Sequence, residues 1–116
     1  MKHVRPAVPV APWLGGKKIL AARIIERIEA IPHKTYVEPF VGMGGVFLRR
    51  RLQPTCEVAN DLNGEIVNLF RVIQRHLSYL RDHMRFTLSS RRAFEDLRAT
   101  PTSGLTDIER AARFLY

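Results

Sequence analysis

The chain has 116 residues, 46% of them hydrophobic and 26% charged, with a net charge of +8. This length fits one soluble domain, and because no apolar stretch approaches the roughly 20 residues of a membrane span, no membrane helix is expected. The positive charge favours a phosphate-rich partner, while the single cysteine, Cys56, and a proline-interrupted N-terminus favour a cytoplasmic protein without an internal disulfide.

The first half of the chain alternates helical and extended patterns. Residues 1–12 are expected to form an irregular arm, and apolar residues at helical spacing predict a helix over 17–31. The β-branched and aromatic stretches 35–41 and 56–61 predict two strands, with a short helix over 46–52 between them. Strand, glycine turn, helix and strand in this order are typical of the βαβ unit of a nucleotide-binding sheet.

The second half is helical in pattern. Ser90 predicts the N-cap of one helix, and Thr106 with Glu109 predicts a capping box for the last. The long helix before them is expected to break near Ser78. Its apolar stripe is predicted to contain Ile66, Phe70, Ile73, Leu77 and Leu80. The chain stops at Tyr116 within the last helix, which we interpret as a truncation.

Positive charge in the second half comes from arginine. Residues 71–113 contain nine arginines and no lysine, against five acids. The planar guanidinium matches phosphates and base edges, so this composition favours contact with nucleic acid. A solvated helical face is the alternative. The histidines and Cys56 lack the spacing of metal ligands, and we assign no metal site.

A glycine turn follows the first predicted strand. Gly42, Gly44 and Gly45 allow the backbone to approach a bound nucleoside closely. Asp61 ends the second strand, close to the roughly 20-residue offset at which an acid accepts hydrogen bonds from a ribose hydroxyl. We therefore predict that Asp61 binds a ribose, with a cap of the following helix as the alternative role.

Glu38 and Pro39 lie where a dinucleotide-binding strand would be apolar, since a pyrophosphate repels a carboxylate. A cationic ligand reverses the sign of this interaction, and S-adenosylmethionine carries a sulfonium and an ammonium. Glu38 thus argues against NAD and for a methyl donor. Pro39 donates no ladder hydrogen bond, so it predicts the strand end at which the backbone turns toward the site.

The segment PWLGGKK, residues 12–18, lacks the first glycine and the hydroxyl residue of a phosphate-binding P-loop, which excludes that motif. Trp13 remains a candidate wall of an apolar pocket, and Lys17 a candidate partner of a ligand carboxylate. A core anchor and a surface charge are the alternative roles for these two side chains.

Four segments in succession, PWLGGKK, YVEPFVGMGGVFL, VANDLNGEIVNLFRVIQ and AARFLY, resemble the motifs of Dam-type adenine-specific DNA methyltransferases. In this class the cofactor motifs precede a target-recognition region and then the catalytic motif. The resemblance implies an α/β fold: a partial Rossmann-like S-adenosylmethionine-dependent methyltransferase domain followed by a helical segment. It assigns residues 1–70 to the N-terminal part of the cofactor-binding domain. Residues 71–116 then begin a helical region that contacts double-stranded DNA.

The resemblance also implies roles for single residues. The tryptophan and lysine of the first motif contact S-adenosyl-L-methionine in that family, which implies this role for Trp13 and Lys17. The acid after the second strand binds the ribose, here Asp61. The turn over the methionine moiety is matched by Glu38, Pro39, Phe40, Gly42 and Gly44.

Family members continue to a DPPY motif, which holds the adenine amino group and stacks on the flipped base. This sequence has no pair of consecutive prolines, so no catalytic residue is assigned. We expect the whole enzyme to methylate the exocyclic amino group of adenine in DNA. We expect this chain alone to be inactive, with a second polypeptide supplying the motif if the gene is split.

The alternatives are an inactive prophage remnant and a non-catalytic basic nucleic-acid-binding module. A nicotinamide dehydrogenase fragment is disfavoured by Glu38 and by Phe47, where a small residue is wanted.

Overall fold

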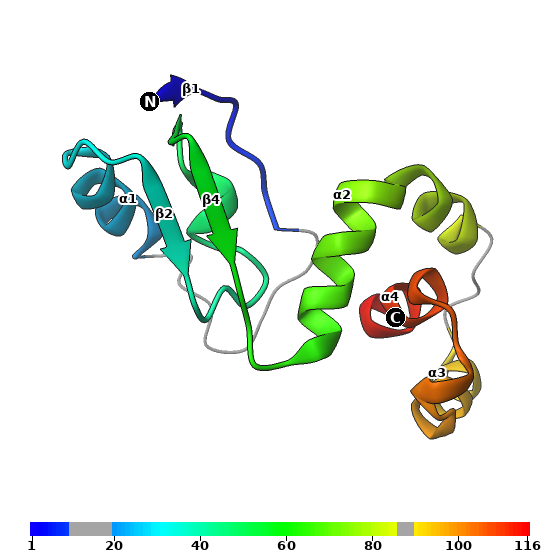
Figure 1. Ribbon diagram of the computed structural model, residues 1–116. Coiled ribbons are helices and arrows are strands. Elements are labelled where there is room, and N and C mark those ends of the chain that lie inside the picture. The colour runs from blue at the N-terminus through cyan, green and yellow to red at the C-terminus, as the bar shows by residue number, and fades with distance from the viewer. Residues whose placement is uncertain (10–19, 86–89) are drawn as a thin grey trace. The chain divides into compact units, whose positions relative to one another are not determined.

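The structure is a computed structural model that describes residues 1–9, 20–85 and 90–116 (Figure 1). The chain divides into two compact units, Met1–Leu62 and Asn63–Tyr116. Within the described residues the first unit contains all the strands, and the second is built from helices. The predicted mixture of strands and helices is confirmed at this level.

The central element of the first unit is a parallel pair of strands, β2 (Thr35–Glu38) and β4 (Cys56–Ala59). Their register pairs Glu38 with Ala59, so both carboxyl ends lie at the same edge. This pairing confirms that the two predicted strands run side by side in one direction. The first ends at Glu38, short of the predicted range, because Pro39 has no N–H to donate to the ladder.

Helix α1 (Ala21–Glu29) contributes its apolar face to the core of this unit. Ala21 and Ile25 form a buried cluster with Val46, and two further isoleucines of the helix pack against it. The helix is part of the one predicted over 17–31, whose first three residues lie outside the described ones.

The segment between the parallel strands is not the helix predicted over 46–52. Only a single 3₁₀ turn, η1 (Phe47–Arg49), forms there, and Arg50 is already extended with φ −64° and ψ 145°. The short strand β3 (Leu52–Gln53) follows and pairs antiparallel with β1 (Lys2–His3). The prediction of an irregular N-terminal arm is therefore wrong at these two residues.

Bonds to distant residues replace the predicted helix. Glu29 accepts hydrogen bonds from the backbone N–H groups of Arg51 (2.5 Å) and Leu52 (3.1 Å), and Val4 donates its N–H to the Arg51 carbonyl (2.8 Å). Burial alone would raise the pKa of Glu29, but these bonds and the Arg51 guanidinium together lower it. Because the backbone groups already have partners elsewhere in the unit, the chain leaves the helical conformation.

The second unit begins with the long helix α2 (Gly64–Met84), which bends in Figure 1. The backbone is non-helical at His76, with φ −138° and ψ 34°, two residues before the break predicted near Ser78. The proposed domain boundary after residue 70 falls inside this helix, and that domain assignment stays a prediction.

The buried face of α2 differs in part from the predicted stripe. Its buried side chains are Ile66, Leu69, Val72 and Leu80. Phe70, Ile73 and Leu77 of the predicted stripe are only half-buried. Helix α4 (Asp107–Leu115) packs against α2, and its small residues Ala111 and Ala112 are buried.

The predicted caps of the shorter helices are confirmed. Ser90 Oγ accepts from the Ala93 N–H (3.1 Å) at the start of α3 (Arg91–Ala99). A 3₁₀ turn, η2 (Thr102–Gly104), comes before α4. There the Thr106 and Glu109 side chains each accept from the other residue's backbone N–H at 3.2 Å, which is the capping box read from the sequence.

Candidate functional site

The glycine turn directly follows β2. Gly42 has φ 56° and Gly44 has φ 82°, in the left-handed region that favours glycine. The Gly44 N–H donates to the Val41 carbonyl (3.0 Å), and the Val41 N–H donates to the carbonyl of Asn60 (2.9 Å), just beyond β4. The turn read from the sequence is therefore formed, and it is tied to the end of the second parallel strand.

Asp61 lies at this turn. Its Oδ2 accepts a hydrogen bond from the Gly42 N–H at 3.0 Å, which joins residues 19 positions apart. The neighbouring Asn60 Nδ2 donates to the Pro39 carbonyl at 3.2 Å. A carboxylate has two oxygens with about four acceptor positions, so it is able to accept several hydrogen bonds at once. The turn and the acid expected to bind a ribose thus meet at the carboxyl ends of the two strands.

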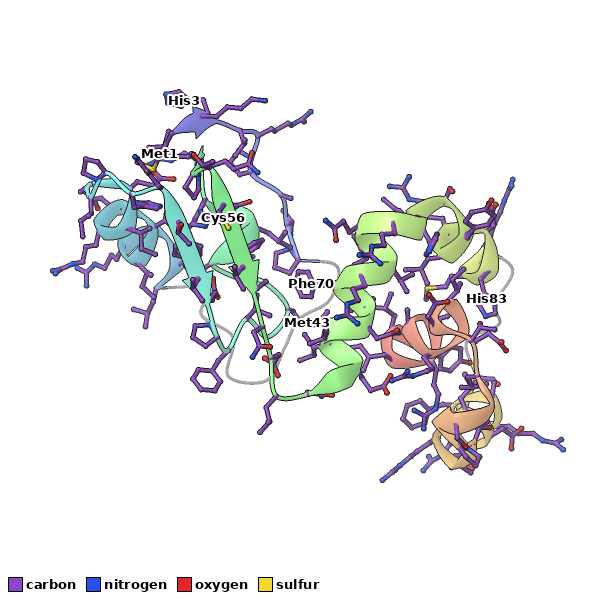
Figure 2. The ribbon with its side chains drawn as sticks, in the orientation of Figure 1. Met1, His3, Met43, Cys56, Phe70 and His83 are labelled. Carbon is purple, nitrogen blue, oxygen red and sulfur yellow. The ribbon has the colours of Figure 1, made fainter. Side chains whose placement is uncertain are left out.

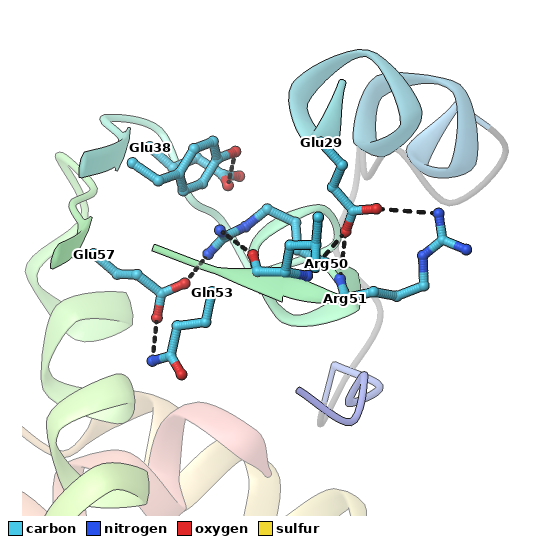
Figure 3. A network of polar contacts seen from close by, with 8 residues as sticks. Glu29, Glu38, Arg50, Arg51, Gln53 and Glu57 are labelled. Atoms are coloured by element: carbon cyan, nitrogen blue, oxygen red, sulfur yellow. Dashed lines mark hydrogen bonds and ion pairs between the residues drawn. The ribbon is translucent and has the colours of Figure 1, made fainter. Parts of the chain in front are cut away.

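Glu38 is the last residue of β2 and is half-buried. Its Oε2 accepts a hydrogen bond from the Tyr36 hydroxyl at 3.0 Å (Figure 3). Side chains two positions apart in a strand share one face, which explains why these two meet. Glu38 and Asp61 therefore flank the glycine turn, each bonded to a different partner.

Pro39 and Phe40 are the candidates that remain at this end of the sheet. Pro39 is exposed next to Glu38, and Phe40 is 76% exposed at the same end of the sheet. Met43, inside the glycine turn, is buried (Figure 2). Trp13 and Lys17 lie outside the described residues.

A network around Arg50 was not predicted from the sequence. The side chain is buried and forms an ion pair with Glu57 on β4 (Figure 3). Its guanidinium carbon lies 3.8 Å from the centroid of the Tyr36 ring and 4.9 Å from that of Phe47. Gln53 Nε2 also donates to Glu57, at 3.0 Å. The strand register places Glu57 opposite Tyr36 on the same face, and sequence patterns do not reveal this register.

This environment changes the acidity of Tyr36. Burial, the negative charge of Glu38 and the hydrogen bond to it raise the Tyr36 pKa to about 12, although the Arg50 guanidinium acts in the opposite direction. The hydroxyl, which a tyrosine keeps protonated at neutral pH in any case, donates to Glu38.

The nine arginines of the second half divide into two groups. Two of them support the fold: Arg110 Nη2 donates to Glu65 (2.6 Å), and Arg113 Nε donates to the Leu97 carbonyl (2.7 Å). The other seven are exposed: Arg71, Arg75, Arg81, Arg85, Arg91, Arg92 and Arg98.

The described part of the chain offers no other recognised site. Its helices include none with both the length and the apolar character of a membrane span. Its histidine, cysteine and acidic side chains form no group of three that could ligate a metal ion.

Comparison with known proteins identifies a family. The family model of D12 class N6 adenine-specific DNA methyltransferases matches residues 13–116. The chain is 31% identical to a type II methyltransferase of Lactococcus lactis subsp. cremoris, over 93% of this chain and 39% of that protein. It is 34% identical to a DNA adenine methylase of Haemophilus influenzae, over 64% of this chain and 25% of that protein. A DNA N-6-adenine-methyltransferase of Escherichia phage P1 is 29% identical, over 99% and 16% respectively. The chain thus spans about two fifths or less of these relatives.

Proposed function

Because the chain belongs to the D12 class of N6 adenine-specific DNA methyltransferases, we propose that its first unit binds S-adenosylmethionine at the carboxyl ends of β2 and β4. The hydrogen bond from the Gly42 amide to the Asp61 carboxylate is the observation that carries this proposal. It brings the glycine turn and the candidate ribose acid together at the edge where parallel sheets bind ligands. Carboxylates also suit the two cationic groups and the ribose diol of this cofactor.

The residues proposed to contact S-adenosylmethionine are Trp13, Lys17, Glu38, Pro39, Phe40, Gly42, Gly44 and Asp61. Asp61 accepts hydrogen bonds from the ribose hydroxyls, and Glu38 attracts the cationic methionine end of the ligand. The glycine turn lets the backbone approach that end closely. When bound, S-adenosylmethionine supplies an electrophilic methyl group, which the chain positions.

The proposed reaction is methylation of the exocyclic amino group of adenine in DNA. In this proposal the chain supplies the cofactor-binding part, and a DPPY motif outside these 116 residues holds the amino group. DNA would contact the second unit, where the seven exposed arginines suit phosphate oxygens.

One face of the sheet exposes a pair of valines, which fits a surface that further protein elements cover. Within the described residues the sheet of β2 and β4 has two strands. Val37 and Val58 are paired across them, on the face opposite Tyr36, and are 53% and 44% exposed. Parallel sheets bury both faces in known folds, so this valine pair fits a surface that further elements of the family's domain cover.

Calorimetric titration of the purified chain with S-adenosylhomocysteine and with NAD tests the cofactor class. We expect S-adenosylhomocysteine to bind and NAD to bind at least about tenfold more weakly, because Glu38 repels a pyrophosphate. Preferential binding of NAD would contradict the proposal. Binding of DNA without S-adenosylhomocysteine would instead support a non-catalytic basic module.

Co-expression tests this division of roles. The chain would be produced together with a polypeptide that carries the rest of the family's domain, including DPPY, and methylated adenine in the host DNA would be measured. We expect methylation only when both are present, and none when this chain carries Asp61→Ala. Methylation by the partner alone would contradict the proposed division of roles.

A further inference from the structure

The Tyr36 hydroxyl has no role in the proposed function, yet it donates directly to Glu38 at 3.0 Å. A glutamate at the end of a strand has several rotatable bonds, and fixing it only when a ligand arrives costs conformational entropy. A donor that is already in place reduces this cost before the ligand binds.

The Tyr36 ring is itself fixed from several sides. The Arg50 guanidinium stacks at 3.8 Å from the ring centroid, and the Phe47 ring lies 6.2 Å away, centroid to centroid. Arg50 is in turn anchored by its ion pair with Glu57 and by a bond to the Leu52 carbonyl (3.5 Å). A continuous series of contacts therefore leads from β4 to the carboxylate at the end of β2 (Figure 3).

The chemical nature of the donor matters for a cationic ligand. A lysine or arginine in the place of Tyr36 would add a positive charge beside Glu38 and weaken its attraction for another cation. A neutral hydroxyl orients the carboxylate and leaves its charge unchanged. A tyrosine hydroxyl with its ordinary pKa of 10.0 already keeps its proton in the neutral range, and burial and Glu38 raise the Tyr36 pKa further, to about 12.

We propose that Tyr36 is a positioning residue: it holds the Glu38 carboxylate in the orientation that receives the ammonium of the methionine moiety, and Arg50 fixes the Tyr36 ring for this purpose. The inference rests on the proposed function, and it assigns Tyr36 to recognition of the amino-acid end of the ligand. The nucleoside end depends on Asp61 and is independent of Tyr36.

Two ligands separate these ends in calorimetric titrations of the full chain. S-adenosylhomocysteine carries the ammonium, whereas methylthioadenosine has the same adenosine and thioether without it. We expect Tyr36→Phe to weaken S-adenosylhomocysteine binding about tenfold and to leave methylthioadenosine binding within about twofold. Tyr79→Phe is the matched control, because Tyr79 is 64% exposed in the second unit, and it should change neither ligand.

A double-mutant cycle with Glu38→Gln gives a second readout. If Tyr36 acts through the Glu38 charge, the double variant should bind S-adenosylhomocysteine as weakly as Glu38→Gln alone. Equal losses for both ligands in Tyr36→Phe would indicate a general structural effect and overturn the inference, as would full additivity in the cycle. If Glu38→Gln weakens binding and Tyr36→Phe does not, the inference fails while the proposed function stands. If the unsubstituted chain does not bind S-adenosylhomocysteine, both fail.

Discussion

Replacing Glu57 with alanine should lower the free energy of unfolding of the first unit by about 3 kcal/mol, because it leaves the buried Arg50 guanidinium without its ion-pair partner. The Arg50 side chain is only 2% exposed, and its buried Nε has no hydrogen-bond partner among the residues that the structure describes. Urea denaturation monitored by amide signals of β2 and β4 would measure the change in this unit.

Two further variants make this prediction specific. Glu95→Ala removes an acid from the exposed pair that Arg91 and Glu95 form at 3.3 Å, and it should change stability by less than about 0.5 kcal/mol. Replacing both Arg50 and Glu57 by methionine and leucine should recover most of the loss, since no buried charge is left unpaired. A Glu57→Ala effect as small as that of Glu95→Ala would mean that Arg50 does not depend on this pair.

Asp61→Ala should weaken S-adenosylhomocysteine binding about 100-fold, equivalent to about 2.7 kcal/mol. The variant removes the acceptor proposed for the ribose hydroxyls and also the bond that ties the Gly42 amide to the end of β4. Calorimetric titration measures the affinity, and circular dichroism checks that the variant is folded.

Asp61→Asn separates the two contributions. An amide oxygen can still accept from the Gly42 N–H, so the turn keeps its anchor while the negative charge is lost. We expect an intermediate loss of affinity for this variant. Asp96→Ala, an exposed acid on α3, is the matched control and should bind as the unsubstituted chain does. Unchanged affinity in Asp61→Ala would remove the ribose role from this residue.

The parts of the fold that sequence patterns predicted correctly depend on local chemistry. Gly42 and Gly44 adopt positive φ because the turn requires it, and Pro39 ends the strand because it lacks a donor. The caps at Ser90 and Thr106 each involve residues three apart, so their side chains could be assigned from spacing alone. The meeting of Asp61 with the turn followed from the carboxyl ends of parallel strands sharing one edge.

The parts that sequence patterns predicted wrongly or did not reveal depend on tertiary partners. The helix expected over 46–52 is replaced by extended backbone because Glu29 and β1 supply its hydrogen bonds. The bond from Tyr36 to Glu38 was not predicted, and it arises from strand alternation. The ion pair of Arg50 with Glu57 requires the strand register, which composition and spacing do not reveal.

A crystal structure of the chain bound to S-adenosylhomocysteine tests the central claim most directly. The account predicts that the ligand occupies the carboxyl ends of β2 and β4, with ribose hydroxyls within hydrogen-bond distance of Asp61 and the ammonium next to Glu38. A ligand found elsewhere on the molecule, or an empty site beside the glycine turn in crystals grown with excess ligand, would contradict it.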